Sequence, residues 1–283
     1  MKITTLLLFF LWAAPAVCAQ SANPKPKTPP PIQDNSFLLE EAYNQEAGVV
    51  QHINTFTRLG GAWLYTFTQE WPVFSQKHQF SYTVPALRVG ESPLVARGLG
   101  DIALNYRYQL LGDGGAKVAL APRFSVLLPT GNERRGLGVG AAGIQFNFPA
   151  SVMVAEKVVT HWNAGVTYVP GARNERREKA DLTGYNVGGS VIWQTAPVFN
   201  LMLETVWNRT QSVAGPGRTE RDDSVIVNPG IRWAHNFRSG LQIVPGVAVP
   251  VSVGPGKREA GIFFYLSFEH PFTRSAQPGG AGH

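Results

Sequence analysis

The chain has 283 residues, of which 11% are aromatic and only 16% are charged, and its formal net charge is +6. No internal stretch approaches the roughly 18 unbroken apolar residues that a membrane-spanning helix needs, which excludes a helical membrane protein. The basic residues mostly stand beside acidic ones, as in GARNERREKAD. This arrangement indicates solvated loops and predicts no nucleic-acid partner.

The first 19 residues have the composition of a secretory signal peptide. Lys2 precedes the apolar run ITTLLLFFLW, and the small residues Val17 and Ala19 stand before the expected cleavage site. Cys18 raises a lipoprotein alternative, which is less favoured because Val17 stands where such signals use Gly, Ala or Ser. The only cysteine then leaves with the signal, so disulfides and cysteine-ligated metals are excluded from the mature chain.

Four segments follow the signal peptide. The linker is rich in proline and is not expected to pack a core. The next segment, 34–48, begins with DNSFLLEEAYNQE and is expected to form one or two turns of helix after Ser36. It acts either as a tether, the preferred interpretation, or as a plug in a barrel mouth. The expected segments are 1–19, signal peptide; 20–33, linker; 34–48, N-terminal segment; 49–272, folded domain; and 273–283, flexible tail.

From residue 49 onward the chain repeats alternating runs of about ten residues, separated by turn signals. Side chains alternate across a strand, so each run has an apolar and a polar face. In VFNLMLETVWN, for example, Leu201 and Leu203 oppose Asn200 and Glu204, and Met202 shares the polar side. The expected strands lie near 49–58, 61–71, 77–89, 99–111, 116–129, 139–154, 158–169, 183–194, 198–210, 223–235, 240–251 and 259–272.

The connections between these runs alternate in length. Short turns on the periplasmic side and longer loops outside are typical of outer-membrane barrels. The connections near 59–60 and 72–76 depart from this alternation. Long connections are expected near 89–98, 130–138, 170–182, 211–222 and 252–258, and short ones near 112–115, 155–157, 195–197 and 236–239.

Aromatic residues near the ends of the apolar faces indicate which side faces water. A soluble β-sandwich, the alternative, would fill its apolar faces with Val, Leu and Ile. Tyr and Trp at the ends of an apolar band form interfacial girdles in membranes. We therefore predict an all-β fold, an antiparallel transmembrane β-barrel of about 12 strands in the bacterial outer membrane. The aromatic residues are Trp63, Tyr65, Trp71, Tyr106, Tyr108, Trp162, Tyr168, Tyr185, Trp193, Trp207 and Trp233.

The polar faces of the expected strands would then line the lumen. Their charges either pair across the interior and stiffen the wall, or select the permeating molecule. Both interpretations stay open, and twelve strands leave an interior between that of filled small barrels and that of open porins. The candidates are Glu70, Asp101, Asn105, Arg107, Arg123, Asn147, His161, Asn163, Asn200, Glu204, Asn228, Arg232 and Glu269.

Catalytic and cofactor motifs are weak in this sequence. Gly138, Gly140 and Gly143 match a dinucleotide fingerprint on paper, but an alternating strand with Pro149 follows where that motif needs a helix. The histidines suggest no Ser–His–carboxylate set at the outer rim, and no cluster has metal-ligand spacing. We therefore expect no catalytic residue, no metal and no cofactor.

The loop PGARNERREKADL brings four basic residues together with three acidic ones. Most of this charge is expected to be satisfied locally. Alternatively, the basic side chains meet phosphates of lipopolysaccharide, which with outer-membrane lipid is an expected partner. The basic residues are Arg173, Arg176, Arg177 and Lys179, and the acidic ones are Glu175, Glu178 and Asp181.

Several stretches resemble a bacterial family of outer-membrane transporters labelled the MetA-pathway of phenol degradation family. They are NSFLLEEAYNQEAGVVQHI, TQEWPV, GLGDIALNYRYQL, PRFSVLLPTGN and IQFNFPAS, within residues 35–272. The Gly-Asp at the start of one strand and the Pro-Thr-Gly at the end of another are the most specific. The resemblance implies an outer-membrane barrel and, by its label, uptake of aromatic or hydrophobic compounds.

These observations predict an outer-membrane channel for passive passage of small molecules. The alternative is a closed barrel that acts as a scaffold or adhesin through its outer loops. A membrane-embedded, lipid-modifying enzyme is a minor alternative.

Overall fold

The structure, a computed structural model, describes residues 32, 36–90, 95–254 and 258–272. The expected signal peptide and tail lie outside the described residues, as does the linker except for Ile32. Within the described residues, no helix is long and apolar enough to cross a membrane.

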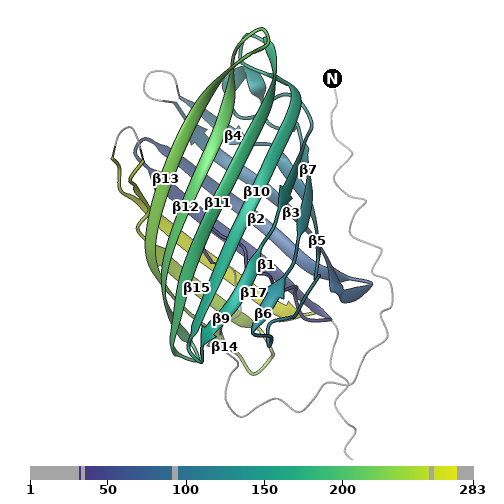
Figure 1. The fold of residues 1–283 in the computed structure, drawn as a ribbon, viewed down its shortest axis with the longest axis vertical. Coiled ribbons are helices and arrows are strands. Elements are labelled where there is room, and N and C mark those ends of the chain that lie inside the picture. The colour runs from purple at the N-terminus through teal and green to yellow at the C-terminus, as the bar shows by residue number, and fades with distance from the viewer. Residues whose placement is uncertain (1–31, 33–35, 91–94, 255–257, 273–283) are drawn as a thin grey trace, which may run out of the picture.

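Twelve antiparallel strands close into a barrel, as predicted (Figure 1). Some are interrupted, so that two labels form one strand of the barrel. β1 pairs with both β2 and β17, which closes the wall. The strands are β1 (Val49–Leu59), β2 (Ala62–Val73), β3 (Ser75–Val89), β4 (Ala96–Leu99) with β5 (Ile102–Tyr108), β6 (Val118–Leu120) with β7 (Arg123–Leu128), β8 (Gly143–Asn147) with β9 (Ala150–Ala155), β10 (Val158–Arg173), β11 (Lys179–Ala196), β12 (Phe199–Gly215), β13 (Arg218–Trp233) with β14 (His235–Asn236), β15 (Gln242–Ala248) with β16 (Val251–Ser252), and β17 (Gly261–Pro271).

The apolar faces of the strands point outward, which is the reverse of a soluble protein. On β12, Leu201 and Leu203 are 37% and 50% exposed, whereas Asn200 and Glu204, which flank them, are fully buried. The same pattern leaves Trp162 and Trp193 more than half exposed. Because exposed large apolar side chains are stable only against another apolar medium, this outer surface suits lipid.

We call the end where β1 begins and β17 ends the terminal rim, and the opposite end the hairpin rim. Two connections expected as long loops at the hairpin rim, 170–182 and 211–222, are instead mostly strand. Backbone pairing continues to Arg173 and Lys179 in one hairpin and to Gly215 and Arg218 in the other, so those loop predictions were wrong. Figure 1 shows these strands rising above the rest of the barrel.

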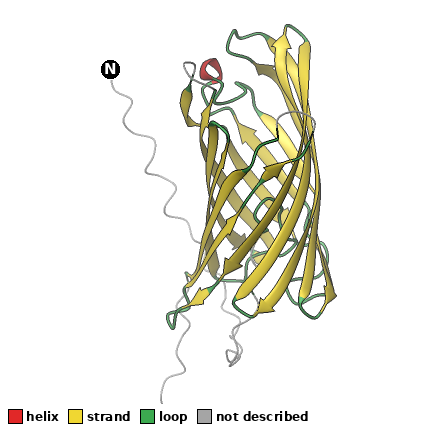
Figure 2. Cartoon of the chain, turned by 90° about the vertical axis from the view of Figure 1, so that its left-hand side faces the viewer, coloured by secondary structure: helices red, strands yellow, loops and turns green. Residues whose placement is uncertain are grey.

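Two further boundaries differ from the sequence prediction. The connection near 72–76 is a single residue, Phe74, whose positive φ of 62° allows the chain to reverse at once. The strand expected from residue 139 begins only at Gly143, and the residues before it form a loop that carries one 3₁₀ turn, Glu133–Arg135 (Figure 2). No helix follows the three-glycine motif, as its interpretation as the start of a strand predicts.

The Gly-Asp motif at 100–101 and the Pro-Thr-Gly motif at 129–131 are hydrogen-bonded to each other at the hairpin rim. Asp101 accepts hydrogen bonds from the backbone N–H groups of Gly131 (2.8 Å) and Val139 (2.9 Å). Thr130 accepts one from Ile102 N–H and donates one to the carbonyl of Gly100, both 2.9 Å. These contacts attach the loop 129–142 to the wall at the break between β4 and β5.

Replacing Asp101 by alanine is expected to release this loop. Two lost hydrogen bonds, each worth about 1 kcal/mol, correspond to about a thirtyfold rise in local opening. Trypsin should then cut after Arg134 and Arg135 at least about tenfold faster, while the barrel stays folded. Asp113→Ala is the matched control, because Asp113 accepts from Gly115 N–H in a turn at the terminal rim. Equal cleavage of both variants would contradict the prediction.

Candidate functional site

Residues 36–48, which we call the inner segment, lie inside the barrel and form neither a helix nor a strand, with bends at 37–39 and 42. Phe37, Leu39 and Ala42 are 6%, 3% and 0% exposed, although the segment belongs to no strand. The helix expected after Ser36 is therefore absent, and the preferred interpretation as a tether is insufficient. Ile32 is also buried, at 2% exposed, so the end of the linker does pack against the interior, contrary to expectation.

The wall holds the inner segment through alternate backbone N–H groups. Each of these groups donates to a side-chain oxygen of a different strand or connection. Because a buried backbone N–H group needs a hydrogen-bond partner, each of these groups requires an acceptor from the wall. The bonds run from Leu38 to Glu204 (2.9 Å), Glu40 to Asn163 (3.0 Å), Ala42 to Ser151 (2.8 Å) and Asn44 to Gln109 (2.9 Å). This requirement for acceptors outweighs the helical tendency of the segment.

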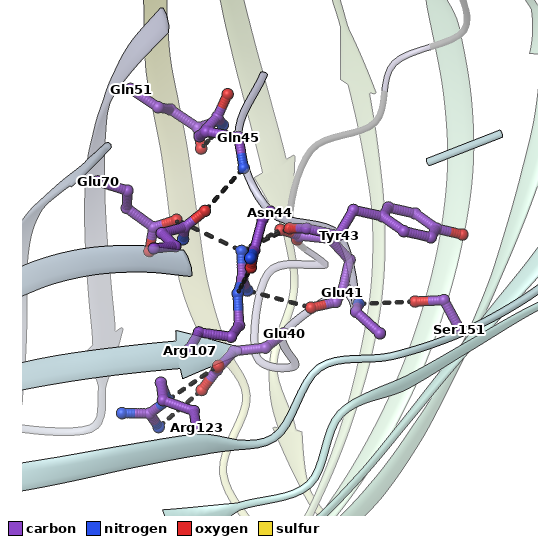
Figure 3. A network of polar contacts seen from close by, with 12 residues as sticks. Glu40, Glu41, Tyr43, Asn44, Gln45, Gln51, Glu70, Arg107, Arg123 and Ser151 are labelled. Carbon is purple, nitrogen blue, oxygen red and sulfur yellow. Dashed lines mark hydrogen bonds and ion pairs between the residues drawn. The ribbon is translucent and has the colours of Figure 1, made fainter. Parts of the chain in front are cut away.

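Arg107 of β5 holds the inner segment with several donors at once (Figure 3). Its Nε donates to Asn44 Oδ1 (3.0 Å), and its Nη1 donates to the carbonyl of Glu41 (3.1 Å). Its Nη2 donates to the Tyr43 carbonyl and lies 3.4 Å from the Glu41 carboxylate and 3.8 Å from that of Glu70. The side chain of Arg107 is 4% exposed, so removing a partner leaves a buried charge uncompensated.

Arg123 of β7 holds the same segment one residue earlier. Its Nη2 and Nε contact the two carboxylate oxygens of Glu40 at 2.7 and 2.9 Å, a bidentate pair. Arg123 also donates hydrogen bonds to two wall residues, from Nη1 to Asn105 at 2.7 Å and from Nη2 to Gln145 at 2.9 Å. Asn147 donates to Glu40 at 3.0 Å, so three strands of the wall converge on one glutamate of the segment.

Phe37 anchors the start of the inner segment in an apolar recess. Its ring lies 5.1 Å from that of Phe263 and 5.4 Å from that of Tyr265, both on β17. A Cβ on Gly230 or Gly246 would come within 2.6 Å of the Phe37 ring, so the wall makes room by having no side chain there. This recess explains why apolar side chains occur on the inward face of these strands.

The structure points the predicted polar residues inward and brings most of them to the inner segment. Asn105 contacts Arg123, and Asn228 donates to Glu204 at 2.8 Å. Asp101 is apart, at the hairpin rim, and Asn200 and Arg232 are fully or almost fully buried. In direct contact with the segment are Arg107, Arg123, Asn147, His161, Asn163, Glu204 and Glu269.

Two further wall residues, which the sequence did not single out, also hold the segment. Gln79 accepts from Gln45 N–H at 2.7 Å and donates to Glu70 at 2.7 Å. Gln109 accepts from Asn44 and donates to the carbonyl of Ala42 at 2.7 Å. Both have the inward parity of Glu70 and Arg107, so the same alternation would have found them had glutamines been included beside the asparagines.

Two cavities remain beside the inner segment. The larger, about 170 Å³, lies between residues 36–40 and a wall rich in hydroxyl groups, including Thr55, Thr66, Thr68 and Thr83. The smaller, about 80 Å³, is lined by Ile32, Tyr43, His161 and Arg232, and reaches Gly114 and Glu156 in turns of the terminal rim. The segment thus borders both of these cavities.

The interior offers no recognisable catalytic set. Ser151 Oγ lies 2.7 Å from His161 Nδ1 and accepts the N–H of Ala42, so this pair holds the segment. Within the described residues, His161 has no carboxylate hydrogen-bond partner, as a catalytic triad would require. In the same part of the chain, no group of three or more His, Cys, Asp or Glu residues is placed to hold a metal.

Comparison with known proteins supports the fold. No family model and no curated protein matches the chain. The COG4313 outer membrane channel from Pseudomonas putida F1 matches with a TM-score of 0.62 and 11% identity, over 81% of this chain and 97% of that one. The NanC porin matches with a TM-score of 0.52 and 8% identity, over 77% and 98%. The chain therefore has the barrel fold of bacterial outer-membrane channels.

Proposed function

We propose that the protein is an outer-membrane channel for passive passage of small molecules, and that the inner segment closes it. The observation that carries this proposal is that residues 36–45 bind side chains of the wall and belong to no strand of the sheet. No backbone pairing between strands is lost when the segment leaves, and water can solvate the polar side chains left behind. The segment is thus a removable occupant of an otherwise polar lumen.

The proposed cargo is a small aromatic or hydrophobic compound. The resemblance to the MetA-pathway of phenol degradation family supports aromatic or hydrophobic compounds. The hydroxyl-lined cavity with Tyr265 and Phe37 at one side is compatible with a small aromatic molecule that also carries polar groups. The terminal rim, which has the shorter turns, is proposed to face the periplasm.

A reversible cross-link tests whether passage requires the segment to move. Ser36 Oγ and Ser190 Oγ lie 2.8 Å apart, so the variant S36C/S190C brings two thiols close to disulfide distance. In planar bilayers, oxidation should reduce the open fraction about tenfold or more, since the bond fixes the segment to β11. Reduction should restore it.

The control is a disulfide within the wall, Q69C/Y82C, at directly opposite positions of β2 and β3 whose side chains face away from the lumen. Oxidising this pair should leave conduction unchanged. If oxidised and reduced S36C/S190C conduct equally, the segment does not close the channel. If neither state conducts any small solute, the channel proposal fails and the scaffold or adhesin alternative is favoured.

A further inference from the structure

Three arginines form one row across neighbouring strands at the hairpin rim. In the strand register, Arg58 of β1 is opposite Trp63 of β2, Trp63 is opposite Arg88 of β3, and Arg88 is opposite Arg97 of β4. Residues directly opposite in antiparallel strands project from the same face of the sheet. We call Arg58, Arg88 and Arg97 the arginine row.

The arginine row faces outward, away from the lumen. Thr55 and Thr66 line the inner cavity, and Arg58 and Trp63 each lie three positions away along their strands, which reverses the direction of the side chain. On the other side of Arg58, its partner Ile262 is 42% exposed on the lipid-facing wall. The arginine row therefore lies on the outer surface of the barrel, at the hairpin rim.

An apolar row runs directly beneath it, two residues closer to the terminal rim. Phe264, Phe56, Tyr65, Ala86 and Leu99 are consecutive partners across the same strands. Phe264 and Leu99 are 45% and 58% exposed, and the rings of Phe56 and Phe264 are 6.4 Å apart. An apolar band topped by cationic groups matches a lipid with acyl chains below and an anionic head above.

The charges of the arginine row are not compensated by the wall. Arg88 and Arg97 are direct cross-strand partners, an arrangement of like charges that is destabilising. Arg88 Nη1 lies 3.6 Å from where a Cβ of Gly61 would be, in the turn between β1 and β2. In the described parts of the chain, none of the three arginines forms an ion pair.

Elsewhere on the outer wall the protein does supply a counter-charge. Arg209 and Asp223 are cross-strand partners of β12 and β13, with Nε and Oδ1 2.8 Å apart. The contrast indicates that the arginine row is left cationic for an anion that the protein does not itself provide.

We propose that the arginine row binds the phosphate of a lipid in the outer leaflet, with the acyl chains of that lipid on the apolar row. Guanidinium groups match phosphate oxygens in geometry as well as in charge. This inference goes beyond channel function, because it requires only that the hairpin rim lies in the outer leaflet. A phosphorylated glycolipid such as lipid A has the required chemistry.

Native mass spectrometry of the detergent-solubilised full chain tests the proposal. The three probes are bisphosphorylated lipid A, the same lipid without phosphates, and inorganic phosphate. The variant R88Q/R97Q should bind lipid A about 25-fold more weakly, at about fivefold for each arginine near a charged membrane surface. Arg221→Gln is the matched control, because Arg221 lies on β13 near Asp223, and it should bind as the wild type does. The variant R88K/R97K, which keeps both charges, should lose less than R88Q/R97Q.

Equal lipid A binding by R88Q/R97Q and the wild type would overturn the proposal. So would equal binding of the phosphorylated and dephosphorylated lipids by the wild type, a comparison that holds even if the variant fails to fold. Tight binding of inorganic phosphate without preference for the lipid would assign the row to free phosphate instead. None of these results depends on conduction, so failure here is distinct from failure of the channel proposal.

Discussion

Arg107→Ala is expected to raise the open fraction of the channel by about two orders of magnitude. The substitution removes the donors to Asn44 and to the carbonyl of Glu41, and it leaves the Glu41 carboxylate buried beside that of Glu70. Breaking a buried ion pair by removing one partner costs about 3–5 kcal/mol. This free-energy cost destabilises only the closed state, in which the segment is docked, because Glu41 is solvated once the segment leaves the wall. About 3 kcal/mol corresponds to about a 150-fold shift between the two states.

Single-channel recordings in planar bilayers measure this effect directly. Arg209→Ala is the control, because it also breaks an arginine–carboxylate pair of the barrel but has no contact with the inner segment. Heat-modified migration on gels establishes that each variant forms a barrel. An open fraction of Arg107→Ala equal to that of the wild type would show that this arginine does not hold the segment closed. Arg107→Lys, which keeps the charge without the planar fork, should lie between the two.

Phe37→Ala is expected to release the start of the segment without touching any charge. Truncating a buried phenylalanine to alanine costs about 3–5 kcal/mol, because the recess beside Phe263 and Tyr265 is left empty. Amide hydrogen exchange of residues 36–45 should accelerate about a hundredfold, since exchange of these groups requires undocking. Gly246→Val should have the same effect from the wall side, because its side chain would overlap the Phe37 ring.

The matched control is Phe74→Ala, which removes an aromatic ring that is 82% exposed in a turn at the terminal rim. Exchange within residues 36–45 should then be unchanged. If Phe37→Ala leaves these amides as protected as in the wild type, the polar contacts alone hold the segment, and the apolar recess has no part in closure.

The barrel was predictable from sequence because its signal recurs in every strand. Lipid on one side and a polar lumen on the other impose alternation, as Leu201, Glu204 and Leu203 illustrate on β12. The prediction failed where the strands leave the membrane. In TERDD of β13 both faces are polar, so the alternation disappears although backbone pairing continues to Arg218. A strand that faces water on both sides has the composition of a loop.

The inner segment was harder to predict because its conformation is imposed from outside. Nothing in LLEEAYNQE distinguishes an irregular chain from a short helix, since the acceptors that hold its backbone N–H groups belong to Glu204, Asn163 and Ser151. One signal was present: Met202 and Phe263 are large apolar residues on inward faces, and both are buried. Apolar side chains inside a polar lumen require an apolar partner, which here is Phe37 and Ile32.

The side-chain attachment of the inner segment also makes its release threshold adjustable. A backbone ladder fixes its strength and register together, whereas each contact here depends on one wall residue, such as Gln79 or Gln109. Single substitutions at such positions change the holding strength in small steps while the strand pairing of the barrel stays intact. Related barrels could therefore diverge from nearly always closed to nearly always open through the lumen alone, with the same wall presented to the lipid.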